Sequence, residues 1–127
     1  MSTLRTNTLQ NAAGSKSVPM DTVVDGTAKA WVNFDGTGTV AIRTAFNVSS
    51  ITDNGTGQYT VNFTTAMTDA NYATLATAGD SAVNYTVAFT SSNATPTASA
   101  VRVQVVTQNS GNPTAFDVNR VAIAVFD

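Results

Sequence analysis

The sequence contains no cysteine and no histidine, and its eight acidic residues are all aspartate. Without cysteine, the chain can form neither a disulfide bond nor a thiolate metal site. Without histidine as well, it lacks the commonest general base and the usual nucleophile–base pair of hydrolytic enzymes. These absences argue against an enzyme, and we expect the chain to hold neither a cofactor nor a metal ion.

Charge of either sign is also scarce, because six lysine and arginine residues stand against eight aspartates and the net charge is −2. Such a chain has no basic surface for nucleic acid and no polybasic segment for an anionic membrane. No apolar run approaches the roughly 18 residues that a membrane span requires, and residues 1–6 lack the apolar core of a secretory signal. We therefore expect neither nucleic-acid binding nor membrane insertion, and we expect assembly in a cytoplasm or arrival on a particle.

What the sequence does contain, from residue 28 onward, is an alternation of apolar and polar residues. Tyr59, Val61 and Phe63, for example, alternate with threonine and asparagine, which is the pattern of a half-buried strand. Turn-forming segments separate such stretches, and the strongest is residues 53–57, which are rich in asparagine and glycine. About seven or eight short strands with this spacing predict an all-β fold, a single antiparallel β-sandwich.

The alternation also predicts where the strands lie and which side chains face the core. The predicted strands cover residues 31–34, 40–48, 59–63, 72–77, 83–89, 101–105 and 121–125. Residues 109–113 are predicted to form a loop, and no window fits a helix better than a strand. The side chains expected to point inward are Val40, Ile42, Phe46, Tyr59, Val61, Phe63, Val83, Val87, Val101, Val103, Val121, Ile123 and Val125.

Residues 1–27 lack the alternation of apolar and polar residues found in the rest of the chain. Leu4 and Leu9 recur at no helical or strand period, and Pro19 interrupts any pattern that remains. Such a segment cannot bury a face of its own. Two interpretations stay open: a frayed terminus, or an extended anchor arm that becomes ordered on a partner. We expect two parts, an N-terminal arm at residues 1–27 and a sandwich domain at residues 28–127.

Four aspartates, Asp35, Asp53, Asp69 and Asp80, are the first candidates for an acid–base pair of the kind that cleaves glycosides. All four lie in turn contexts, however, where aspartate is favoured because its side chain bonds to nearby backbone. Their neighbours supply too few oxygen ligands for calcium. We interpret these aspartates as structural, and we assign no catalytic, cofactor-binding or metal-binding residue.

Three other side chains are candidates for a contact surface. Trp31, the only tryptophan, either lies in the core or at a subunit interface, or stacks on a sugar ring. Arg43 and Arg120 lie within apolar runs, and each is either paired at an interface or plainly solvated. None of the three can be assigned to receptor binding from the sequence.

Three stretches of the chain together resemble one known family. The segment from Ala30 to Ala73 carries most of the resemblance, and residues 2–10 and 121–126 add to it. It includes Trp31-Val32-Asn33-Phe34-Asp35-Gly36-Thr37-Gly38 and Asp53-Asn54-Gly55-Thr56-Gly57-Gln58-Tyr59-Thr60-Val61-Asn62-Phe63. These stretches resemble phage tail-fibre-like virion proteins, including those of cyanobacterial and marine phages. Residues 80–117 match only in character, as a variable, loop-bearing surface would.

The resemblance implies a structural component of a bacteriophage particle. It implies a tail-fibre-like homotrimer whose residues 1–27 attach to other virion proteins and whose β-domain points outward for host attachment, with a host-surface glycan as the receptor class to test. The alternative is a capsid decoration or cement protein, or a baseplate or tail adaptor, because no shaft separates the arm from the domain. Scarce charge also leaves edge strands open to pairing, which a closed assembly would bury.

Overall fold

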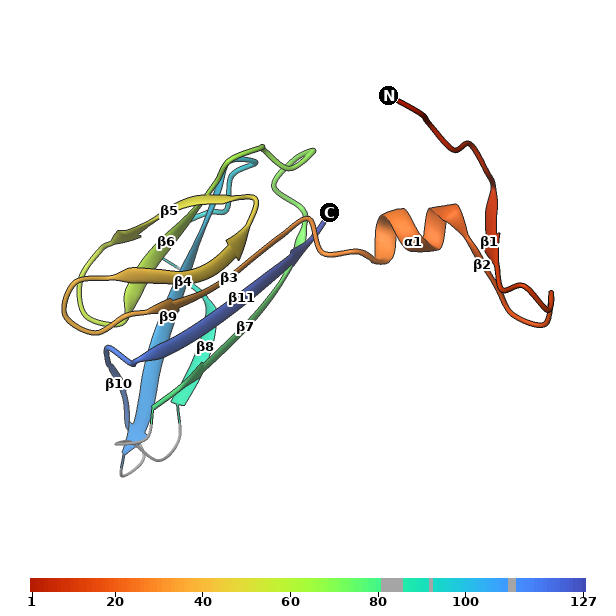
Figure 1. The fold of residues 1–127 in the computed structure, drawn as a ribbon. Helices are drawn as coiled ribbons and strands as arrows, with labels where there is room; N and C mark the ends of the chain where they lie inside the picture. The colour runs from red at the N-terminus through yellow and green to blue at the C-terminus, as the bar shows by residue number, and fades with distance from the viewer. Residues whose placement is uncertain (81–85, 92, 110–111) are drawn as a thin grey trace.

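The computed structural model describes residues 1–80, 86–91, 93–109 and 112–127, and Figure 1 shows its fold. In chain order its elements are β1 (Thr8–Gln10), β2 (Ser17–Pro19), α1 (Met20–Gly26), β3 (Ala30–Asp35), β4 (Ala41–Phe46), β5 (Val48–Asp53), β6 (Gln58–Phe63), β7 (Ala73–Gly79), β8 (Thr86–Thr90), β9 (Ala100–Asn109), β10 (Asn112–Ala115) and β11 (Arg120–Phe126).

Two antiparallel sheets form the sandwich. One sheet has the strand order β4-β3-β11-β7. In the other sheet, β9 pairs with β6 along its first half and with β10 along its second half. β5 pairs with the other side of β6, and β8 pairs with the other side of β9. A third, two-stranded sheet, β1-β2, lies in the arm (Figure 1). The all-β prediction is therefore confirmed, with one small sheet and one short helix that it did not include.

The core lies between the two larger sheets and takes side chains from both. Phe34 on β3 meets Tyr59 on β6 edge to face, with ring centroids 5.1 Å apart. Eight of the side chains predicted to point inward are buried: Tyr59, Val61, Phe63, Val101, Val103, Val121, Ile123 and Val125. They are joined by Ala30, Val32, Phe34, Met67, Val105 and Val118. Burying a valine or phenylalanine side chain contributes about 1.5–3 kcal/mol, so this cluster is the main source of the domain's stability.

The inward prediction is wrong for Phe46 and Val87, which are 55% and 49% exposed. Ile42 lies opposite the buried Phe34 and so faces the core side, but on the edge strand β4 it stays 39% exposed. Val40 is only partly buried against the core, and Val83 lies outside the described residues. Because successive side chains of a strand point to opposite faces, a small change of register moves a whole set from the core to the surface.

Two local features explain the error in the segment predicted as one strand, residues 40–48. Asn47 has a positive φ of 53°, which ends β4 and turns the chain into β5 of the other sheet. The pairing of β4 with β3 shifts between Asn33 and Phe34, so Arg43 is an extra residue with no partner opposite it. This bulge puts the side chains of β4 before and after Arg43 out of the regular inward–outward alternation. The predicted loop at residues 109–113 is also partly wrong, because β10 begins there and pairs with β9.

The arm contains structure that its sequence did not predict. β1 and β2 form a short hairpin, and the seven-residue helix α1 follows directly after Pro19. The Thr27 hydroxyl donates a hydrogen bond to the Val23 carbonyl at the end of that helix, yet none of the helix residues is buried. In Figure 1 the hairpin and helix lie away from the sandwich, joined to it at β3. No helix in the described part of the chain is long and apolar enough to cross a membrane.

Candidate functional site

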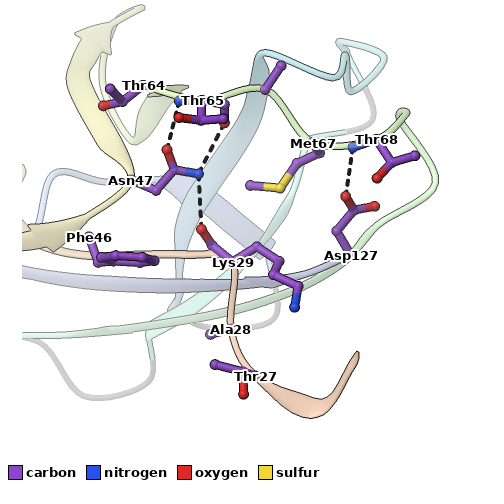
Figure 2. A pocket seen from close by; sticks show the side chains of 11 residues that line it. Thr27, Ala28, Lys29, Phe46, Asn47, Thr64, Thr65, Met67, Thr68 and Asp127 are labelled. Carbon is purple, nitrogen blue, oxygen red and sulfur yellow. Dashed lines mark hydrogen bonds between the residues drawn. The ribbon is translucent and has the colours of Figure 1, made fainter. Parts of the chain in front are cut away.

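A groove of about 690 Å³ lies at the end of the sandwich where the arm joins it (Figure 2). Four segments meet there: the arm–β3 connection, the β4–β5 corner, the loop after β6, and Asp127 beyond β11. The lining residues are Thr27, Ala28, Lys29, Phe46, Asn47, Thr64, Thr65, Ala66, Met67, Thr68 and Asp127. This volume falls within the range of about 300–1,000 Å³ that is usual for ligand pockets.

Asn47 holds the walls of the groove together. Its Nδ2 donates to the carbonyls of Lys29 and Thr65, both at 3.0 Å, and its Oδ1 accepts from the Thr65 amide at 2.7 Å (Figure 2). The Asn47 carbonyl also accepts from the Thr64 amide at 3.2 Å. One side chain therefore fastens the root of the arm and the loop after β6 to the β4–β5 corner, and asparagine is a residue that tolerates the left-handed backbone required here.

The groove combines an apolar wall with a polar rim. Met67 is 5% exposed and, with the Phe46 ring, supplies apolar surface, whereas threonines supply hydroxyl groups. Lys29 and Asp127 are the ionisable side chains of the lining, and both have partners: Lys29 Nζ donates to the Val24 carbonyl, and Asp127 Oδ2 accepts from the Thr68 amide at 2.6 Å. This arrangement suits an amphipathic segment or molecule held by hydroxyl groups and apolar contact.

A second surface, which we name the apolar row, begins at Phe46 on the edge of the groove. Phe46 lies opposite Trp31, Trp31 opposite Ala124, and Ala124 opposite Leu75, so the row crosses all four strands of the sheet β4-β3-β11-β7. Residues directly opposite each other on paired strands point to the same side of the sheet. Phe46, Trp31 and Leu75 are 55%, 39% and 57% exposed, which rules out the core as the place of Trp31.

Arg43 lies on this same sheet and is paired. Its guanidinium donates to Asp35 Oδ2 at 2.9 Å, and more distantly to Asn33 Oδ1 and the Phe34 carbonyl at 3.4 and 3.3 Å. The Thr37 hydroxyl and amide, which both donate to Asp35, hold the pKa of that carboxyl below its ordinary value, and Arg43 adds to the effect. Both partners are partly exposed to water, so this pair orients side chains more than it stabilises the fold.

Arg120, the other arginine considered from the sequence, is exposed at the start of β11, which favours a solvated role.

Three of the four candidate aspartates make the local turn bond that the sequence predicted, whereas Asp80 accepts a bond from a distant segment. Asp35, Asp53 and Asp69 each accept, through Oδ1, the amide hydrogen of the residue two positions later, at 2.9, 2.9 and 2.6 Å. Asp80 Oδ2 accepts from the Asn119 amide at 3.0 Å. In the described part of the chain, no three acidic side chains gather closely enough to hold a metal ion.

A partly buried polar cluster around Asp117 was missed by sequence reasoning. The Tyr59 hydroxyl lies 2.7 Å from Asp117 Oδ1 and 3.0 Å from the Gly36 carbonyl, and the Gly57 amide donates to the same Asp117 oxygen at 2.7 Å. Burial and the Asp117 carboxylate raise the pKa of Tyr59. A Cβ at Gly36 would lie 2.4 Å from the tyrosine oxygen, so glycine is required there. The cluster ties three loops together at the end of the sandwich opposite the groove.

Comparison of the chain with protein families, with curated proteins and with solved structures finds no match. A functional assignment therefore rests on the residues and their geometry.

Proposed function

We propose that this chain is a structural component of a bacteriophage particle. It serves as a tail-fibre-like module that forms a homotrimer, attaches through residues 1–27 to other virion proteins, and takes part in host attachment with its sandwich. The resemblance of residues 2–10, of the segment from Ala30 to Ala73 and of residues 121–126 supports the family, and the all-β fold agrees with it. The proposal assigns no catalytic step to the chain, which a depolymerisation assay on host-surface polysaccharide tests.

The arm is the observation that carries this proposal. Among the described residues, the backbone-to-backbone hydrogen bonds of residues 1–27 lie within the arm, as from the Met20 amide to the Asn7 carbonyl at 2.9 Å, and the Lys29 side chain adds one bond from the domain to the Val24 carbonyl. Leu4, Leu9 and Val24 are 82%, 41% and 53% exposed. A hairpin and a seven-residue helix with no buried residue gain little stability alone. Such a segment is stabilised by a partner, which supports a role in attachment.

The first experiment places the protein on the particle. A tagged copy of the chain, detected by gold labelling in electron microscopy of intact virions, is expected at the tail. Label spread over the head would replace the tail-fibre role with capsid decoration, and label at the tail base would favour an adaptor. Virions that carry no label, although the tag is accessible on the free protein, would refute the virion assignment altogether.

The second experiment tests the arm as the anchor. Particles are assembled with the double variant Leu4→Asp and Leu9→Asp, and the matched control is Thr3→Asp with Thr8→Asp, which adds the same charge to neighbouring exposed positions. We expect the control to be incorporated like the wild type and the leucine variant to be lost from the particle. Equal incorporation of all three proteins would show that the apolar side chains of the arm do not anchor it.

A further inference from the structure

We propose that the apolar row, which runs from Phe46 through Trp31 to Leu75, is the surface through which copies of this chain meet. The inference rests on the homotrimer of the proposed function and names the surface that such an assembly uses. It also gives a reason for the exposure of the only tryptophan, because Trp31 lies in a contiguous row with Phe46 and Leu75, and contiguous apolar patches on a surface often mark interaction sites.

The edges of the two sheets are poor surfaces for association. β4 and β5, which lie next to each other at the Asn47 corner, each contain a register shift: one opposite Asn33 and Phe34, the other between Val48 and Ser50. β10 is a four-residue edge strand that contains Pro113, and proline cannot donate a ladder hydrogen bond. On the other side, β7 and β8 lie side by side (Figure 1). Bulges, proline and covered edges all oppose edge-to-edge pairing, so copies meet through a face.

Polar side chains that bond to one another cover most of the outer face of the second sheet. Asn62 Nδ2 donates to the hydroxyls of Ser50 and Thr52 at 3.1 and 3.0 Å. Arg102 donates to Gln58 Oε1 at 2.7 Å on the same face. These groups bond to one another across β5, β6 and β9, although in the described part of the chain Arg102 Nε is buried with no hydrogen-bond partner. Covering this face would cost the desolvation of its exposed polar groups. On the described part of this face, the large apolar side chains that are exposed are Val87 and Phe89 on β8.

The face of the apolar row has the composition of an interface. Two aromatic rings and Leu75 lie in one line, the neighbouring line across the sheet is Thr44, Asn33, Ala122 and Thr77, and the nearest ion pair, Arg43 with Asp35, lies beyond it. Interface centres are rich in aromatic residues and poor in charge, with a polar rim around them.

Around the three-fold axis of a homotrimer, the same row of three copies can converge, and a charge-free row brings no like charges together there. From the exposed fractions, the two rings present on the order of 200 Å² of apolar surface. That is about a quarter of one side of a standard interface, so the row is the centre of the contact and the surrounding threonine, asparagine and alanine side chains complete it.

The test is the molar mass of the full chain in solution, measured by multi-angle light scattering. The variants are Phe46→Lys and Leu75→Lys, at the two ends of the row, and only the first of these also lines the groove. The control is Phe89→Lys on β8, whose exposure of 39% equals that of Trp31. We expect three times the 13.1 kDa chain mass for the wild type and the control, and a monomer, or a dissociation constant raised roughly tenfold or more, for both row variants with an unchanged circular dichroism spectrum.

Emission from Trp31, the only tryptophan, gives a second readout that needs no substitution. Dilution of the wild type through its dissociation range should shift the emission to longer wavelengths as the ring enters water. A mass that falls on dilution with no change in emission would overturn the row as the contact surface. A trimer that survives both row variants would also overturn it while leaving the homotrimer intact. A wild type that is monomeric at every concentration would refute the homotrimer and this inference together, but not the location of the protein on the particle.

Discussion

The hydroxyl of Tyr59 lies 2.7 Å from Oδ1 of Asp117, to which it donates a hydrogen bond although 58 residues separate the two in the chain. This contact links the middle of the second sheet to the loop that leads into β11. The same carboxylate oxygen accepts from the Gly57 amide, so one aspartate fixes both the β5–β6 turn and a core tyrosine. The hydrogen bond therefore sets the relative position of loops that share no strand.

Replacing Tyr59 with phenylalanine should lower the free energy of unfolding by about 1–3 kcal/mol, because it removes a buried hydroxyl that donates to the partly buried Asp117 carboxylate and lies beside the buried Gly36 carbonyl. Urea unfolding followed by circular dichroism measures the change. Tyr72→Phe is the comparison, because the Tyr72 hydroxyl lies 2.9 and 3.0 Å from two neutral carbonyl oxygens. The free energy of unfolding should fall less in this variant than in Tyr59→Phe. Equal losses in the two variants would show that the Asp117 contact adds nothing specific.

The free energy of unfolding should fall at alkaline pH because of Tyr59. Burial, followed by the hydrogen bond to Asp117, raises the pKa of Tyr59 above its ordinary value of 10.0. Above about pH 10 the unfolded chain loses this proton while the folded chain keeps it, so the free energy of unfolding decreases as pH rises. Below pH 10 the contribution is complete. Burial also raises the pKa of Tyr72, so the slope has at least two sources.

The pH profile of Tyr59→Phe isolates the part that Tyr59 supplies. Urea midpoints of the wild type and the variant, measured from neutral pH to about pH 11.5, should differ most at neutral pH and converge as the pH rises above 10. A constant difference across this range would mean that the pKa of Tyr59 is not raised by folding.

The parts of the fold that the sequence predicted are those set by near neighbours. Tyr59, Val61 and Phe63 alternate with polar residues, and a strong turn precedes them, so strand β6 and its inner face could be read directly. The Asx turns of Asp35 and Asp53 are local for the same reason, because the bond closes within two residues.

What the sequence could not predict depends on contacts between distant segments. Asn47 bonds to Lys29 and Thr65, each 18 residues away. No local sequence pattern around Asn47 indicates that the chain passes there from one sheet to the other. The groove has walls from four separate segments, and the apolar row exists only once four strands are in register. Sequence could single out Trp31 by its rarity, but only the register of β3 places it on the surface rather than in the core.

The matched pair Phe63→Ala and Phe89→Ala tests the strand register. Phe63 is 7% exposed and Phe89 is 39% exposed, so the first change should cost about 3–5 kcal/mol of the free energy of unfolding and leave a cavity. The second should cost less than about 1 kcal/mol because the ring lies at the surface. Denaturant unfolding measures both. A cost below about 1 kcal/mol for Phe63 would move that side chain to the outer face and shift β6 by one residue.

Substitutions at Asn47 separate its two contributions, the left-handed backbone and the amide side chain. Asn47→Gly keeps a residue that adopts φ near +53° but removes three side-chain hydrogen bonds, whereas Asn47→Ala removes the bonds and adds backbone strain. We expect both variants to be less stable than the wild type, and alanine to be worse than glycine by about 1–2 kcal/mol. Urea midpoints give the order. Equal stability of the two variants would mean that the backbone at residue 47 relaxes out of the left-handed region, and a wild-type-like glycine variant would mean that the amide does not hold the groove walls.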